Sequence, residues 1–323
     1  MEKVVNKKGN LGFSYDYNKK PVLTVEEGEV FTVETEDAMN GIIKSEKDLL
    51  TIINYKPYSD FEPNKSCPLT GPIYIKGAKR GDLLEISIEK IVPNEIGYIA
   101  VYQGSGGLSD YKKWPELGEP YTKMIKHIPG PSGTTRDGKC IYNNNIVWDL
   151  APMIGTIGVC YDYEIFSSLS GQFPSGGNWD CRDIKEGSKL YLNCYHEGGL
   201  LFLGDVHGSQ GDTEWDSAAN EVAADVTLSC RVLKNKKIPY ARIIKEESII
   251  QLNADKPLEL AVRTAIINLM DWITTDYKIS LRDAYSIISA NPEFRINIYQ
   301  MVEGVGIKYT VGAEFPKKYL ENI

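Results

Sequence analysis

Acidic side chains, two of the three histidines and many glycines are concentrated between Phe173 and Glu221. The segment contains the motifs FPSGGNWD at Phe173–Asp180 and GDVHGSQGDTE at Gly204–Glu214. Glycine allows the backbone to approach a ligand closely, and carboxylates with a histidine can surround a metal ion or a reacting water. This composition suits a functional site better than a packed core.

The polar residues of this segment form pairs that are two positions apart: Asn178 with Asp180, Asp205 with His207, and Asp212 with Glu214. In an extended chain such side chains point the same way, so each pair could face one cavity. We expect a short hairpin to join the loop that ends at Asp180 to the strand that ends at Asp205. Alternatively, Asp and Gly are common in turns, and GDVHGSQGD could be only a tight loop.

A histidine with several carboxylates is a ligand set suited to zinc, manganese or a similar divalent ion. Such an ion lowers the pKa of a bound water to about 7 and polarises a carbonyl group. A nearby carboxylate can then pass a proton to a leaving amine. The segment therefore favours metal-assisted hydrolysis, with zinc as the expected ion and calcium or manganese as alternatives.

The motifs resemble those of the acetamidase/formamidase family. GDVHGSQGDTE followed by Glu221 resembles the family's Gly-Asp-Gly-His signature, which carries a second Glu seven residues on. Ser175–Asp180 resembles the family's Gly-Gly-Asn-(apolar)-Asp loop. Other segments fit the remaining blocks in order: Glu34–Ala38, Gly71–Tyr74, Gly187–Leu192 and Gly199–Phe202. The likeness therefore covers most of the chain.

The resemblance implies a mostly-β, cytoplasmic, metal-dependent homodimer that releases ammonia from formamide, acetamide or a related small amide. It implies a metal site formed by four residues: Asp180, Asp205, His207 and Glu221. Asn178 would steady the oxyanion of the reacting carbonyl. Glu214 or Glu221 would pass the proton to the departing ammonia. Which of the acids contact the metal directly stays open at this point.

The chain departs from the family pattern where Val206 and Thr213 replace signature glycines. Trp179 fills the apolar position of the Gly-Gly-Asn loop, and Trp215 stands in a run that is usually small and apolar. We expect Asp37, Trp179 and Trp215 to line the substrate pocket. Bulky groups there would change the choice of substrate.

The same residues are compatible with two other functions. The chain could be a non-enzymatic β-rich protein that keeps the metal loop as structure and binds a small ligand between Trp179 and Trp215. Alternatively, Cys181 could act as a nucleophile if folding supplied His207 as its base. Cys194 and Cys230 lie on apolar strand faces and are interpreted as small core residues. His127 and His196 are interpreted as hydrogen-bonded or turn residues.

The pattern of apolar residues predicts a mainly β fold, with sandwich or barrel-like sheets and a small C-terminal pair of helices. Strict alternation predicts strands at Leu84–Ile88 and Val222–Val232. Recurrence at three and four residues predicts a helix over Pro257–Thr274. A second helix is expected over Ser280–Ala290, opened by a capping box with Asp283. We expect one domain over residues 1–323, with subdivisions near 150 and 255 as an alternative.

The bulk composition excludes several classes of protein. The chain has 36 basic and 44 acidic residues, a net charge of −8, which argues against a nucleic-acid partner and an anionic membrane surface. No apolar run is long enough to span a bilayer, and the N-terminus lacks the apolar region of a secretory signal. Six scattered cysteines without a signal favour reduced thiols in the cytoplasm.

Overall fold

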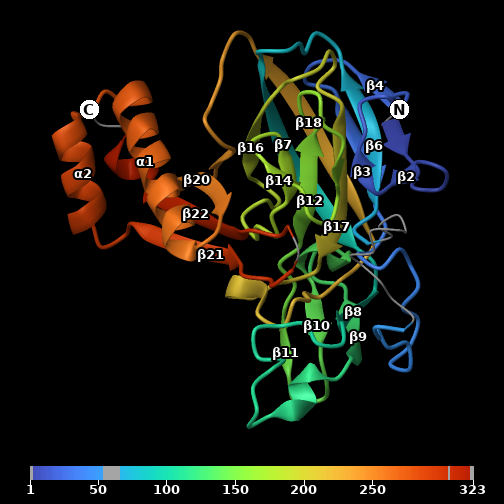
Figure 1. Ribbon diagram of the computed structural model, residues 1–323. Coiled ribbons are helices and arrows are strands. Elements are labelled where there is room, and N and C mark those ends of the chain that lie inside the picture. Colours follow the sequence, from blue (N-terminus) through green and yellow to red (C-terminus); the bar gives the residue numbers. More distant parts are fainter. Residues whose placement is uncertain (1–2, 54–65, 305, 321–323) are drawn as a thin grey trace.

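A computed structural model describes residues 3–53, 66–304 and 306–320 of the chain. It confirms the mainly β fold, with two α-helices among the described residues. The strands form sheets of nine, seven, four and two strands, and none of these described sheets closes into a barrel. Figure 1 shows the two large sheets as a sandwich, the small sheet extending below it, and the helices to one side.

The nine-stranded sheet is antiparallel except where β1 runs parallel to β5. It takes strands from both ends of the chain. Its strands in spatial order are β1 (Lys3–Val5), β5 (Val30–Glu34), β18 (Ala224–Leu233), β7 (Leu83–Pro93), β16 (Lys189–Asn193), β19 (Arg242–Ile244), β20 (Ser248–Asp255), β22 (Tyr309–Pro316) and β21 (Arg295–Gln300).

The seven-stranded sheet faces the nine-stranded sheet across the main core. Its strands in order are β14 (Gln172–Phe173), β15 (Gly176–Asn178), β12 (Met153–Val159), β17 (Leu201–His207), β6 (Leu69–Ile75) and β2 (Leu11–Gly12), with β4 (Leu23–Val25) also paired to β6. Apolar side chains such as Ile86 and Leu190 from one sheet pack in one cluster with Ile157 and Leu203 from the other. This is sheet-on-sheet packing.

The expected hairpin between β16 and β17 is wrong. β16 pairs with β7 and β19, whereas β17 pairs with β12 and β6, so the turn at His196–Gly199 carries the chain from one sheet to the other. Both strands are apolar because both face the same core from opposite sides. His196 is half-buried in this turn and its Nε2 lies 2.9 Å from the Tyr161 carbonyl.

The predicted helical pair is confirmed as α1 (Leu258–Asp276) and α2 (Leu281–Ala290). Ser280 caps α2, because its Oγ accepts the Asp283 N–H at 3.1 Å and donates to Asp283 Oδ2 at 2.7 Å. The apolar stripe of α1 packs on β20 and β22 and forms a second core with Ala265, Leu269 and Phe315. This helical layer extends the sandwich at its C-terminal end (Figure 1).

A small sheet completes the fold, with β8 (Ile96–Val101), β9 (Tyr121–Ile128), β10 (Lys139–Ile141) and β11 (Val147–Asp149). The remaining pair is β3 (Ser14–Tyr15) with β13 (Phe166–Ser167). In the described part of the chain, no helix is long and apolar enough to cross a membrane.

Candidate metal centre

Strand β12 brings the two glycine-rich motifs together. It lies between β15 and β17, and Thr156 on β12 is opposite both Asn178 and Gly204. Asp180 follows β15, while Asp205 and His207 belong to β17. Because β15 and β17 both run antiparallel to β12, which lies between them, their C-terminal ends lie at the same end of the sheet.

The segment after β17 supplies the remaining acids. Glu214 lies in a 3₁₀ turn (Asp212–Glu214), and Glu221 forms isolated bridges with both His207 and Tyr98. Ligand atoms of His207, Glu214 and Glu221 lie within 4.8 Å of one another, and so do those of Asp180, Asp205 and His207. All of these residues are buried. His207 is therefore common to two overlapping sets of metal-binding groups.

The imidazole Nε2 of His207 is the centre of the cluster. It lies 3.4 Å from Glu221 Oε2, 3.7 Å from Asp205 Oδ1 and 3.9 Å from Asp180 Oδ1. Among the described residues, these three oxygens and Glu214 Oε2 are buried without a hydrogen-bond partner. Unpaired buried carboxylate oxygens are costly, so three that converge on one imidazole nitrogen, with a fourth acid in the same cluster, fit a divalent cation between them.

The outward atoms of the same side chains are each held by a donor. The single hydrogen of Thr156 Oγ1 is shared between Asp205 Oδ2 at 2.9 Å and Asn178 Oδ1 at 2.8 Å. The Ala219 N–H donates to Glu221 Oε1 at 3.0 Å, and Gln300 Nε2 donates to Asp180 Oδ2. Asp180, Asp205 and Glu221 thus each have one oxygen fixed and one facing the cluster. Such outer hydrogen bonds orient ligands in metal sites.

Gln210 fixes the tautomer of His207. Its Nε2 donates to the carbonyls of Asp180 and Tyr299, at 2.7 and 2.9 Å, so its Oε1 must be an acceptor. His207 Nδ1, 2.8 Å from that Oε1, therefore carries the hydrogen. When the ring is neutral, the lone pair of Nε2 therefore faces Asp180, Asp205 and Glu221, as a metal ligand requires.

Burial raises the pKa of three acids of the cluster, Asp180, Glu214 and Glu221. Burial, and then the charge of Asp205, raises the pKa of Asp180 to about 7. Burial raises the pKa of Glu221 to about 8, even though His207 opposes this shift. The pKa of Glu214 is raised well above its usual value, mainly by burial. Burial lowers the pKa of His207, but Glu221 and Asp205 outweigh it, so the net shift is upward.

The backbone around the acids is unusual. Asp180, Asp205 and Glu214 have φ angles of 44°, 56° and 48°, and Thr213 has 74°. Residues other than glycine rarely adopt this left-handed backbone conformation, and those that do cluster at functional sites. The signature glycine that Thr213 replaces is thus explained by backbone conformation.

The cluster opens into a cavity of about 110 Å³. Asn178 lines it, with its Oδ1 2.8 Å from Thr156 Oγ1, whose hydrogen it shares with Asp205, and its Nδ2 donating to the Leu169 carbonyl at 2.8 Å. The cavity also has an apolar wall, formed by Met39, Leu169, Val302 and Ile307. All of the metal and catalytic residues expected from the sequence line it: Asn178, Asp180, Asp205, His207, Glu214 and Glu221.

The expected aromatic wall is absent from this cavity as lined by the described residues. Trp179 is fully buried in the main core, with its ring 5.9 Å from that of Tyr240. The reason is alternation, because Asn178 and Asp180 face the cavity and the residue between them must face away. Trp215 is 44% exposed and lies against Gly107. The interpretation of both tryptophans as pocket residues is therefore corrected.

Asp37 also lies outside the cavity, although its neighbours Ala38 and Met39 line it. Its Oδ1 accepts hydrogen bonds from the Tyr98 hydroxyl at 2.6 Å and from the Met39 N–H at 3.0 Å. Asp37 therefore shapes the loop rather than facing the cavity. The Cys181 nucleophile is also not supported, since the side chain is buried in the core and burial raises its pKa well above the usual value.

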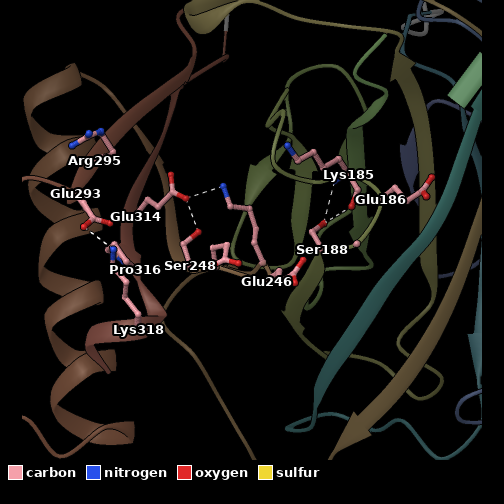
Figure 2. A pocket seen from close by; sticks show the side chains of 13 residues that line it. Lys185, Glu186, Ser188, Glu246, Ser248, Glu293, Arg295, Glu314, Pro316 and Lys318 are labelled. Atoms are coloured by element: carbon pink, nitrogen blue, oxygen red, sulfur yellow. Dashed lines mark hydrogen bonds and ion pairs between the residues drawn. The ribbon is translucent and has the colours of Figure 1, made fainter. Parts of the chain in front are cut away.

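A second hollow, of about 550 Å³, lies between the turn at residues 185–188 and the C-terminal strands. Figure 2 shows its lining, in which Glu314 accepts from Ser248 and from Lys245, and Glu293 pairs with Lys318. These charges neutralise one another. It lacks the converging unpaired acids of the smaller cavity, so its size does not make it the better site.

The fold and the site together define a class of protein: β-sandwich proteins with a buried cluster of one histidine and four carboxylates. The chain belongs to the acetamidase/formamidase family, whose model matches residues 14–171 and 168–312. The resemblance seen in the sequence is therefore confirmed.

Two solved structures are similar over nearly the whole chain. An acetamidase from Bacillus halodurans is 28% identical with a TM-score of 0.86, covering 98% of both chains. An acetamidase from Yersinia enterocolitica is 30% identical with a TM-score of 0.86, covering all of this chain and 94% of its own. A Schizosaccharomyces pombe protein with a provisional formamidase name is 26% identical over 257 residues, 66% of this chain. That match spans 61% of the yeast protein, less than two thirds of its length.

Proposed function

We propose that the protein is a hydrolase that cleaves the C–N bond of a small primary amide to a carboxylate and ammonia, using a divalent ion, with zinc as the first choice. Membership of the acetamidase/formamidase family supports amide hydrolysis. The observation that carries the metal is the set of three buried, unpartnered carboxylate oxygens around His207 Nε2, with the unpartnered Glu214 Oε2 in the same cluster. Zinc commonly binds imidazole and carboxylate together.

Four residues would hold the ion: Asp180, Asp205, His207 and Glu221. When bound, a divalent ion supplies Lewis-acid polarisation of a carbonyl and activation of a water. The chain itself supplies rigid orientation, because Thr156, Gln210, Ala219 and Gln300 fix the outward atoms of these four side chains.

Glu214 and Asn178 are the proposed partners of the substrate. The Glu214 carboxyl is buried, and burial raises its pKa, which favours the protonated form that can deliver a proton to the leaving ammonia. Among the described residues, the Asn178 amide donates one of its two hydrogens to the Leu169 carbonyl. Its second hydrogen remains available to steady the negative oxygen of the reacting carbonyl.

The dimensions of the cavity support a small substrate. About 110 Å³ accommodates a molecule of a few heavy atoms, and Met39, Leu169, Val302 and Ile307 offer an apolar surface to a short acyl group. The rival function as a ligand-binding protein depended on a wall formed by Trp179 and Trp215, and neither residue lines this cavity. The enzymatic function is therefore favoured.

The test is ammonia release from formamide, acetamide and propionamide by purified protein, with zinc added or removed by a chelator. We expect release that requires the ion and is abolished in D205N, while the melting curve of D205N stays cooperative. Full activity in D205N, or equal activity in chelator, would contradict the proposal. Removal of a merely structural ion would instead lower the melting temperature without governing turnover.

We also propose that the protein acts as a cytoplasmic homodimer, on the family resemblance alone. Light scattering on the purified protein distinguishes a dimer from a monomer of 36.1 kDa.

A further inference from the structure

Two buried glutamines connect the C-terminal strands to the candidate metal centre. Gln300, at the end of β21, lines the cavity although it is 79 or more positions from every acid of the cluster. Its Nε2 donates to Asp180 Oδ2, and its Oε1 lies 2.8 Å from Gln172 Nε2. Gln172 belongs to β14, at the edge of the seven-stranded sheet. Both side chains are buried.

The backbone of Lys308 determines the orientation of the first amide. The Lys308 N–H can only donate, and it contacts Gln172 Oε1. The Lys308 carbonyl can only accept, and it lies 2.9 Å from Gln172 Nε2. Reversing the Gln172 amide would break both contacts, so its NH₂ group must face Gln300. A longer contact of 3.0 Å to Thr310 Oγ1 shares the same hydrogens.

The orientation of the second amide follows from the first. Because Gln172 presents hydrogens to Gln300, the Gln300 oxygen must face Gln172, and the Gln300 NH₂ group must face Asp180. The donated hydrogen occupies Asp180 Oδ2. This leaves Asp180 Oδ1, which is buried and unpartnered, 3.9 Å from His207 Nε2.

We propose that Lys308, Gln172 and Gln300 form a glutamine relay, in which a backbone peptide group sets the direction of two amides and so selects which oxygen of Asp180 is offered to the metal ion. Gln172 and Gln300 are positioning residues, and Gln172 acts only through Gln300. The inference rests on the proposed function, since it assumes that the cluster holds an ion. It adds that residues of β14 and β21 control the affinity of that ion.

The sharpest test replaces Gln172 by an isosteric residue with no hydrogens to give. At a pH that ionises the new side chain of Q172E, its carboxylate cannot donate, so the Gln300 amide must turn and present its oxygen to Asp180. We expect zinc affinity, measured by competition with a zinc-binding dye, to fall about 10- to 100-fold in both Q172E and Q300L, the range typical of outer hydrogen bonds in metal sites. If Q172E does not fold, Q172M serves, with a smaller fall expected because orientation is lost without repulsion.

Gln251 supplies the matched control. It is fully buried, and its Nε2 contacts the carbonyls of Tyr240, Ala241 and Leu252 in the nine-stranded sheet. Its Oε1 accepts from Arg242 Nε at 3.0 Å, which would pair with a Glu at this position, so the matched change is to Met. Q251M should lower the melting temperature as Q172M does, yet leave zinc affinity at the wild-type value.

A double-variant cycle separates positioning from general destabilisation. If Gln172 acts through Gln300, Q172E in the Q300L background should cause no further loss of zinc affinity, although it should still lower the melting temperature. Additive losses of affinity, or wild-type affinity in Q172E and Q300L, would overturn the relay. Absence of zinc binding by the wild-type protein would overturn the proposed function as well, and so is a distinguishable result.

Discussion

At the scale of single residues, the candidate metal centre depends on a glycine, Gly155. Gly155 on β12 lies directly beneath two of the acids. A Cβ atom there would be 2.8 Å from Asp180 Oδ1 and 2.9 Å from Asp205 Oδ2. These distances are too short for a real contact, so the carboxylates can converge only over a glycine.

We therefore expect G155A to displace both carboxylates and to lower zinc affinity at least tenfold. G211A is the control, because a Cβ atom at Gly211 meets nothing within 4 Å and its φ of −79° suits alanine. Zinc titration and thermal melting of both variants test this expectation. Equal zinc affinity in G155A and G211A would mean that the two acids do not need this close approach.

The acids and the histidine of the cluster were easier to predict from the sequence than the residues around them. The motif spacing correctly brought Asp180, Asp205, His207 and Glu221 to one place. The rule that placed Asn178 and Asp180 on one face also requires Trp179 to face the core, and that consequence was available from the sequence. Thr156 and Gln300 carried no signal, because a lone Thr or Gln in a strand has no pattern and their contacts depend on long-range pairing.

At the scale of elements, Lys245 joins three segments beside the centre. Its Nζ lies 2.9 Å from Asp183 Oδ1, in the loop after Asp180, and 2.7 Å from Glu314 Oε1 on β22. Figure 2 shows the Glu314 side of this group. Burial alone would raise the pKa of both carboxyls, but Lys245, helped by Tyr299 at Asp183 and by Ser248 at Glu314, outweighs burial and lowers both.

Replacing the lysine should therefore destabilise the protein. We expect K245M to lower the free energy of unfolding by about 2–3 kcal/mol at pH 7, because two partly buried carboxylates lose their cation. The exposed pair of Lys139 with Asp149 gives the control, and K139M should change stability by less than about 0.5 kcal/mol.

The pH dependence of the same variant follows from the direction of the shifts. An acid whose pKa is lower in the folded state stabilises the protein above its unfolded pKa, near 4, and loses that effect as the pH falls through the folded value. The difference between wild type and K245M should thus shrink below about pH 4. Urea unfolding from pH 3 to 7 measures it, and a constant difference would show that Lys245 does not act through these carboxylates.

Elements were predicted well where one strand or helix carries its own pattern. Alternation located β18 and β7, and the capping residues located the start of α2. Partners were not predictable in the same way. The apolar faces of β16 and β17 are alike, so nothing in either strand says that they belong to different sheets.

At the scale of the whole molecule, the protein without a bound metal buries several carboxyl groups close together. Asp180 and Glu221 have pKa values of about 7 and about 8, well above the usual carboxyl range. The folded state therefore holds protons that the unfolded state releases, and stability without metal should fall as the pH rises from about 4 to about 8.

Zinc should reverse this trend, because the ion takes the place of the protons. The rise in melting temperature on adding zinc is expected to be larger at pH 8 than at pH 6. Scanning calorimetry at both pH values, with D205N as the variant that should show little rise, checks this expectation. A rise that is equal at the two pH values would indicate that zinc binds elsewhere.

The glutamine relay has a consequence for how the protein is made. The acids of the cluster are all present by residue 221, but Gln300 and Lys308 come much later in the chain. During synthesis, a chain that has not yet released residue 308 from the ribosome exposes four acids and a histidine without the contacts that order them. If the cluster holds the proposed ion, its tight capture is therefore expected only after residue 308 has left the ribosome, and a shorter chain should compete poorly for metal.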